Sequence, residues 1–152
     1  MENKKFDNVI TSYLNNSMIV ESSSEETSEK NRFWHSDERG KVAVILDNCN
    51  VDFLEYAEFA NSGIKRGHHY HDKYTEYLYV LSGQIRVVAK LLSTGELTNF
   101  IIKRGDLLTI KPNVAHGFLS LSHAEVLTMG TGSNPFNDRK SFKEFPDELY
   151  SV

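Results

Sequence analysis

The sequence predicts an all-β fold, and the chain from Lys41 onward supplies two observations that predict it. Short runs rich in Val, Ile, Leu, Tyr and Phe follow one another, separated at short intervals by Gly, Asn, Ser and Pro. Tight-turn signals stand between them at Ser82-Gly83, at 93–95 (Ser-Thr-Gly) and at 104–106 (Arg-Gly-Asp). This rhythm is typical of a β-sandwich or a small closed barrel. The expected strands are 41–46, 51–59, 67–71, 76–81, 84–91, 97–102, 107–110, 116–121 and 126–129.

The length allows one domain with a real core. The chain has 152 residues, of which 39% are hydrophobic, and its nine Phe, seven Tyr and one Trp can build a compact interior. We assign residues 33–132 to the barrel. Residues 133–152 lose the strand alternation, so we expect a C-terminal arm that is extended or forms a short helix.

The first 32 residues differ from the barrel in composition. Residues 22–30 are polar and acidic without a hydrophobic period, which predicts a flexible acidic linker. Before the linker, apolar residues recur at helical spacing and predict a short amphipathic helix. These residues are Phe6, Val9, Ile10, Tyr13 and Leu14.

Composition excludes several classes of protein. The 17 Lys and Arg are scattered against 21 Asp and Glu, giving a formal charge of −4, so nucleic acid is not an expected partner. No apolar run approaches the roughly 20 residues that span a bilayer, and no signal-peptide core follows Met1, so we expect no membrane partner and a cytoplasmic location. Cys49 is the single cysteine, so a bound metal must rely on His and carboxylate ligands.

Four residues in two segments could meet at one metal ion. His69 and His71 are two apart, which places both imidazoles on one face of a strand. Glu76 opens the next strand on the same face as Leu78, and a carboxylate on an apolar inner face needs compensation. His116 begins a later strand. Three neutral imidazoles and one carboxylate suit one divalent transition metal ion (Mn, Fe, Ni, Zn, Co or Cu) with one or two positions open.

These segments resemble the two motifs of the cupin superfamily. Residues 67–83 match a glycine before HxH, then a glutamate, six further residues and a glycine. Residues 105–116 match a Gly-Asp turn, a proline and a final histidine. Asn113 stands where glycine is usual, and Ala115 where proline often stands. The resemblance implies a double-stranded β-helix (jelly-roll) cupin barrel, commonly a homodimer. In this chain the barrel follows the short N-terminal helical or flexible segment that the composition predicts. It also implies that His69, His71, Glu76 and His116 are the metal ligands.

A narrower resemblance is to cupins that epimerise or isomerise keto-sugar nucleotides. It is carried by residues 37–40 (Asp-Glu-Arg-Gly) and 66–71 (Arg-Gly-His-His-Tyr-His). It implies that His69 is the proton-abstracting base and that Arg66 binds the nucleotide phosphates. His71 replaces the usual glutamine of those enzymes, which completes a set of metal ligands. Because a ligating imidazole cannot also accept a proton, His69 can be either a metal ligand or the base, and these two roles are alternatives. Tyr74, in the loop between ligands, is a third candidate catalytic residue.

A metal site with net positive charge favours an anionic or carbonyl small-molecule substrate. We therefore expect a sugar or sugar-nucleotide isomerase or epimerase. The alternatives are a metal-dependent dioxygenase and a non-catalytic ligand-binding cupin. The sequence leaves two placements open for Arg86, as a cation lining the barrel or as a surface residue, and it favours a surface or interface position for His68.

Overall fold

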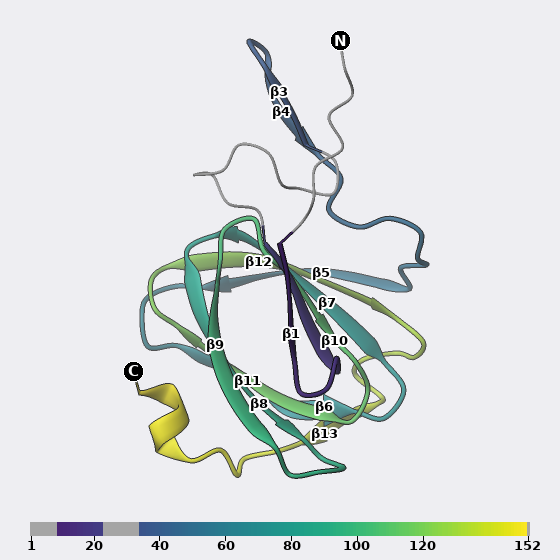
Figure 1. Cartoon of the computed structure of the whole chain (residues 1–152), viewed down its shortest axis with the longest axis vertical. Coiled ribbons are helices and arrows are strands. Elements are labelled where there is room, and N and C mark those ends of the chain that lie inside the picture. The colour runs from purple at the N-terminus through teal and green to yellow at the C-terminus, as the bar shows by residue number, and fades with distance from the viewer. Residues whose placement is uncertain (1–8, 23–33, 152) are drawn as a thin grey trace.

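The computed structural model describes residues 9–22 and 34–151, which form two large antiparallel sheets facing each other (Figure 1). The first sheet has six strands in the order β1 (Val9–Tyr13), β2 (Met18–Ser22), β10 (Leu107–Ile110), β7 (Thr75–Ser82), β12 (Ala124–Thr131) and β5 (Phe53–Phe59). The second has five, in the order β13 (Arg139–Ser141), β6 (Lys65–His71), β11 (Val114–Ser120), β8 (Gln84–Leu91) and β9 (Leu97–Lys103). The hairpin of β3 (Trp34–Asp37) and β4 (Gly40–Ala43) and the 3-10 helix η1 (Asp147–Tyr150) complete the described elements. The predicted jelly-roll barrel is confirmed.

The core lies between the two sheets because their inward residues alternate with outward ones. On β7 the side chains of Glu76, Leu78 and Val80 are buried, while the residues between them are only partly covered. On β8 the inward set includes Ile85 and Val87, both fully buried. Each of the nine expected strands has a counterpart in β4–β12, with bounds shifted by at most three residues. The hydrophobic alternation therefore located the barrel strands.

The expected N-terminal helix is wrong. The segment forms a β-hairpin in which β1 pairs with β2, and β2 pairs with β10 at the edge of the sheet. Asn15 and Asn16 adopt positive φ angles of 52° and 62°, a turn conformation that Asn tolerates and that a helix cannot contain. Pairing with β10 buries Met18 and Val20 completely or nearly so, and this tertiary contact overrides the helical spacing. Phe6 and nearly all of the acidic linker lie outside the described residues.

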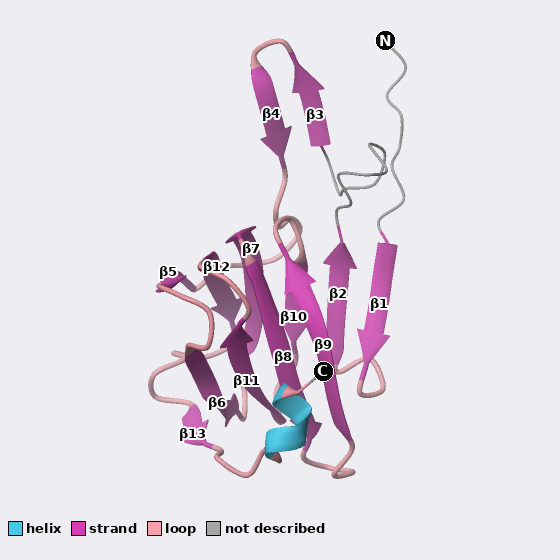
Figure 2. Cartoon of the chain, turned by 90° about the vertical axis from the view of Figure 1, so that its left-hand side faces the viewer, coloured by secondary structure: helices cyan, strands magenta, loops and turns pink. Residues whose placement is uncertain are grey.

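The C-terminal arm is extended and also ends in a short helix, as the sequence allowed. Strand β13 pairs with β6, and η1 contacts β8 and β9 on the outer face of the second sheet (Figure 2). The arm covers a second apolar cluster on that face. Its buried members are Val88, Ala115 and Phe145. The two sheets therefore recruit strands from both sides of the expected barrel range 33–132.

Arg86 takes neither of the two positions left open by the sequence. It lies on the outer face of β8, opposite to Ile85 and Val87, yet its side chain is 5% exposed. Its Nη1 donates a hydrogen bond to Asn99 Oδ1 at 3.0 Å. Arg86 is therefore a buried structural cation between β8 and β9, and it does not face the barrel interior.

No helix in the described part of the chain is long and apolar enough to span a membrane.

Candidate metal centre and active site

Three strands bring the four predicted ligands together inside the barrel. His69 and His71 lie on β6, Glu76 on β7, and His116 on β11, where it pairs directly with His69. One ligand atom from each residue lies within 4.8 Å of all the others. Glu76 Oε2 is 3.2 Å from His116 Nε2, 3.6 Å from His71 Nε2 and 4.0 Å from His69 Nε2. The structure thus brings together the complete cluster that the spacing predicted.

A β-bulge on β6 separates His68 from the cluster. The register with β11 pairs His116 with His69 and then Gly117 with Gly67, so His68 is the extra residue. Gly67 and His68 both have positive φ, 78° and 60°. A Cβ on Gly67 would also lie 3.2 Å from the His116 carbonyl oxygen, so glycine is required there. His68 points instead toward the C-terminal arm, where its Nε2 lies 2.5 Å from Tyr150 Oη. Its side chain is therefore half-buried by contacts with the arm.

A turn in the second motif, residues 105–116, is hydrogen-bonded to the first motif, residues 67–83. Asn113, which stands in place of the usual glycine, has a φ of 63°, the left-handed conformation that Asn adopts more readily than other non-glycine residues. Its backbone N–H donates to the His71 carbonyl at 2.7 Å. Ala115, in place of the usual proline, is buried in the cluster beneath the arm. Both departures from the cupin pattern therefore preserve the position of the ligands.

Burial sets the charges of the cluster. His116 is completely buried, and His71 and Glu76 are 4% and 7% exposed. Burial lowers the pKa of His69 to about 3, helped by the neighbouring His116, so this imidazole is neutral near pH 7. Burial alone would raise the pKa of Glu76, but the attraction of His116 and the other imidazoles lowers it below its usual value, so Glu76 is ionised. A neutral His69 and an ionised Glu76 are the protonation states that metal ligation requires.

Unpaired polar atoms at the centre fit a divalent ion. Glu76 Oε2 and His116 Nε2 are buried, face each other, and make no hydrogen bond within the described residues. His116 Nδ1–H donates to the Val114 carbonyl at 3.0 Å, so in the neutral tautomer Nε2 carries the lone pair that faces the cluster. Leaving such atoms unpaired in the interior is costly, and a cation among them would satisfy them. The donor set fits a divalent transition metal ion.

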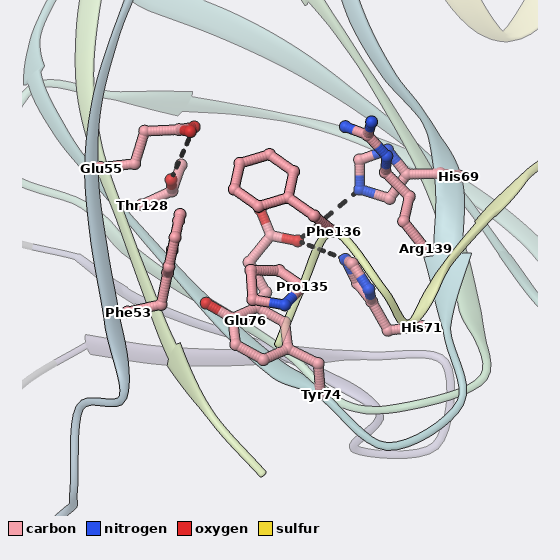
Figure 3. Close-up of a pocket in the computed structure, with 10 residues that line it drawn as sticks. All are labelled: Phe53, Glu55, His69, His71, Tyr74, Glu76, Thr128, Pro135, Phe136 and Arg139. Atoms are coloured by element: carbon pink, nitrogen blue, oxygen red, sulfur yellow. Dashed lines mark hydrogen bonds and ion pairs between the residues drawn. The ribbon is translucent and has the colours of Figure 1, made fainter. Parts of the chain in front are cut away.

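A small open cavity lies beside the cluster (Figure 3). His69, His71 and Glu76 line one end of it. The remaining walls come from β5, the β6–β7 loop, β12 and the arm. These lining residues are Phe53, Glu55, Tyr74, Thr128, Pro135, Phe136 and Arg139. Three inward imidazoles and a carboxylate therefore face a space that a small molecule can enter.

Tyr74 lies in the wall of this cavity, next to the ligands. Its side chain is 3% exposed and packs on Gly130, where an added Cβ would lie 2.3 Å from the phenol oxygen. The backbone N–H groups of Lys73 and Tyr74 donate to Asp138 Oδ2 at 2.8 and 2.9 Å, which ties the loop to the arm. Burial, with the negative charges of Glu76 and Glu55, raises the pKa of Tyr74. The phenol therefore stays protonated and can donate a hydrogen bond or a proton.

Arg66 is not brought into the cavity beside the four-residue cluster. Its side chain is exposed, and its guanidinium donates to the Glu58 carbonyl at 2.9 and 3.2 Å. It borders a neighbouring shallow groove along β5 that shares Glu55 with the cavity. The phosphate-binding role implied by the resemblance stays a prediction for a residue outside the cavity.

The sequence did not identify the rest of the cavity wall. Phe53 and Glu55 alternate on β5, a signal that could have placed both on one face of that strand. Phe136 and Arg139 gave no such signal, because the arm reaches the site only through the pairing of β13 with β6. Arg139 is paired with His71, which lies 68 positions earlier in the chain.

A jelly-roll barrel whose interior holds three histidines and a glutamate on facing strands defines a cupin-type barrel with a candidate metal centre. The sequence model of the polysaccharide biosynthesis C-terminal domain matches residues 19–142. The chain belongs to this family. No curated protein matches the chain.

Several solved structures share the fold. The dTDP-4-dehydrorhamnose 3,5-epimerase from Bacillus anthracis str. Ames, with TDP and PPi bound, superposes with a TM-score of 0.74 at 14% identity, covering 95% of this chain and 89% of that one. The dTDP-6-deoxy-D-glucose-3,5-epimerase from Legionella pneumophila Philadelphia 1, in complex with dTDP-4-keto-L-rhamnose, gives 0.72 at 17% identity, covering 93% and 81%. A 3,4-ketoisomerase from Helicobacter canadensis gives 0.63 at 19% identity, covering 78% and 90%.

Proposed function

We propose that this protein is an isomerase or epimerase of a keto-sugar nucleotide, and that it holds a divalent metal ion with His69, His71, Glu76 and His116. The observation that carries the proposal is the buried four-ligand cluster, which opens into a cavity with a protonated tyrosine in its wall. Membership of a polysaccharide biosynthesis family and a shared fold with sugar-nucleotide epimerases and a ketoisomerase support the substrate class.

The chemistry needs a proton removed beside a carbonyl group and returned to carbon. A bound divalent ion would supply Lewis-acid stabilisation of the negative charge that develops on the carbonyl oxygen. Tyr74 keeps its proton and stands beside Glu76, so it is the proposed proton donor. Glu55 lies in the opposite wall, where Thr128 Oγ1 donates to its Oε1 at 3.4 Å. It is the proposed proton acceptor when His69 is occupied as a ligand.

The resemblance to metal-free epimerases gives His69 a different role in the same function. His69 is the most exposed of the three histidines, with 16% of its side chain accessible, so its imidazole could meet the substrate directly. As a ligand it cannot also accept a proton, whereas without a metal it would be the base and Glu55 would only bind hydroxyl groups. Metal content decides between the two arrangements.

The test combines metal analysis with hydrogen exchange. We expect the protein, purified without added metal, to contain close to one equivalent of a divalent transition metal. Incubated in D₂O with TDP-4-keto-6-deoxyglucose, the ligand named in one ketoisomerase structure, it should exchange a carbon-bound proton beside the keto group, detected by NMR. Exchange that survives complete metal removal would assign the base role to His69. Bound iron with oxygen uptake and no carbon exchange would favour the dioxygenase instead.

A homodimer remains a proposal that the resemblance supports. The outermost strand of the first sheet, β5, presents Leu54 and Tyr56 to solvent, 63% and 54% exposed. An exposed strand edge with apolar side chains favours pairing with another surface. Light scattering coupled to size-exclusion chromatography measures the assembly directly.

A further inference from the structure

The cation that lines the metal cavity is Arg139, which the sequence did not single out. Figure 3 shows its guanidinium beside His69, across the cavity from Glu55 and Thr128. The residue opens β13 and pairs with His71. Its two neighbours fix it in place, since Asp138 accepts the loop N–H groups and Lys140 forms an ion pair with Asp72. The backbone at the cavity mouth is therefore held on both sides of Arg139.

The guanidinium of Arg139 has no hydrogen-bond or ion-pair partner among residues 9–22 and 34–151. In this part of the chain its one recorded interaction is a cation–π contact with Phe136. The guanidinium carbon lies 5.7 Å from the centroid of the phenyl ring. Lys140, one residue later, is paired by contrast. A fixed, exposed guanidinium with its five N–H donors unused, at the edge of a cavity, is suited to an anionic ligand.

We infer that Arg139 binds the diphosphate of the sugar nucleotide at the cavity mouth and thereby orients the sugar ring toward the metal cluster. This inference rests on the proposed function. The cavity is small and open on one side, so it cannot enclose a whole nucleotide and has room for a sugar ring at most. The diphosphate, attached to the first carbon of the sugar, must then leave through the mouth, where Arg139 stands.

Charge and shape at the mouth agree with this placement. The charges of Glu76 and Glu55 balance a divalent ion, so Arg139 is what makes the cavity net positive and attractive to a diphosphate. A guanidinium can hold two phosphate oxygens at once. Phe136, 55% exposed and in edge contact with Phe53 at 5.3 Å, presents an apolar ring beside it that a sugar or base can cover.

Calorimetric titration with TDP tests the inference on the metal-loaded protein. We expect Arg139→Gln to weaken TDP binding on the order of tenfold, because a charge-assisted contact is lost. With the keto-sugar nucleotide as substrate, the same change should raise KM more than it lowers kcat. The matched control is Lys143→Gln, which removes an exposed cation from the same arm outside the cavity and should leave TDP affinity within twofold.

The outcomes separate this inference from the proposed function. If the unaltered protein binds TDP and Arg139→Gln binds it within twofold as well, the Arg139 inference alone is overturned. If the unaltered protein binds neither TDP nor UDP, the nucleotide substrate and the inference both fail. Should Arg139→Gln not fold, Arg139→Lys keeps the charge but loses the two-point contact. A loss of threefold or more in TDP affinity then supports the inference, and a smaller loss overturns it.

Discussion

The floor and the rim of the cavity are built in different ways. The floor consists of His69, His71, Glu76 and His116, which are mostly or fully buried and lie on the paired strands β6 and β11 and on β7 of the facing sheet. The rim includes Glu55, on the outermost strand of its sheet, and Phe136 and Arg139, on the arm. Its residues are exposed and come from distant parts of the chain. The proposed metal site thus lies in the buried part of the barrel, while the residues proposed to contact substrate lie on elements that can vary without disturbing it.

The largest expected effect comes from removing a floor ligand. His116→Gln leaves Glu76 Oε2 and the other imidazoles with an incomplete donor set, so we expect metal content to fall at least tenfold and carbon exchange to be lost. Metal analysis of the purified variant measures it. The control is His123→Gln, which changes an exposed histidine paired with Glu58 and should keep the full metal content. Normal metal content in the His116 variant would remove the metal centre from the floor.

Tyr74 joins floor and rim, and its hydroxyl can be removed without changing its ring. We expect Tyr74→Phe to lower kcat about 100-fold, the usual size of a lost proton donor, while metal content and TDP affinity remain unchanged. Steady-state kinetics and metal analysis on the same samples distinguish a loss of proton donation from a loss of metal. A fall in metal content would mean that Tyr74 supports the cluster and does not act on substrate.

Acid should destabilise the floor of the cavity as the pH falls below about 6.5. The pKa of His69 is lowered from 6.5 to about 3 in the folded protein, so the unfolded chain binds a proton first as the pH falls. Its contribution to stability is present above pH 6.5 and is lost progressively toward pH 3. The lowered pKa of Glu76 acts in the same direction at the acid end of this window. The Tm of the metal-free protein, measured by thermal unfolding, should fall as the pH is lowered from 6.5 toward 3. The Tm of the His69→Gln variant should fall less over the same range. An equal fall in both would remove His69 as the cause.

The sequence predicted the floor and missed most of the rim for a physical reason. His69 and His71 share a face through the two-residue strand period. His116 meets them through the pairing of β11 with β6, and it was predicted because residues 105–116 resemble the second cupin motif. Arg139 reaches the site only through the pairing of β13 with β6, and no local pattern encodes that long-range contact. The N-terminal helix failed likewise, because the free edge of β10 accepted β2 as a strand partner.

The smallest expected effect is at the joint between arm and floor. Asp138 accepts the N–H groups of Lys73 and Tyr74, and these bonds lower its pKa although burial opposes them. Asp138→Ala should cost about 1 kcal/mol in the free energy of unfolding, measured by urea denaturation. It should lower kcat several-fold through displacement of Tyr74, while metal content stays full because no ligand depends on the arm side chain. Asn137→Ala, one position earlier on the same turn, is the control and should leave the free energy of unfolding and kcat unchanged. Loss of metal in Asp138→Ala would show that the arm supports the floor as well as the rim, and the division between them would fail.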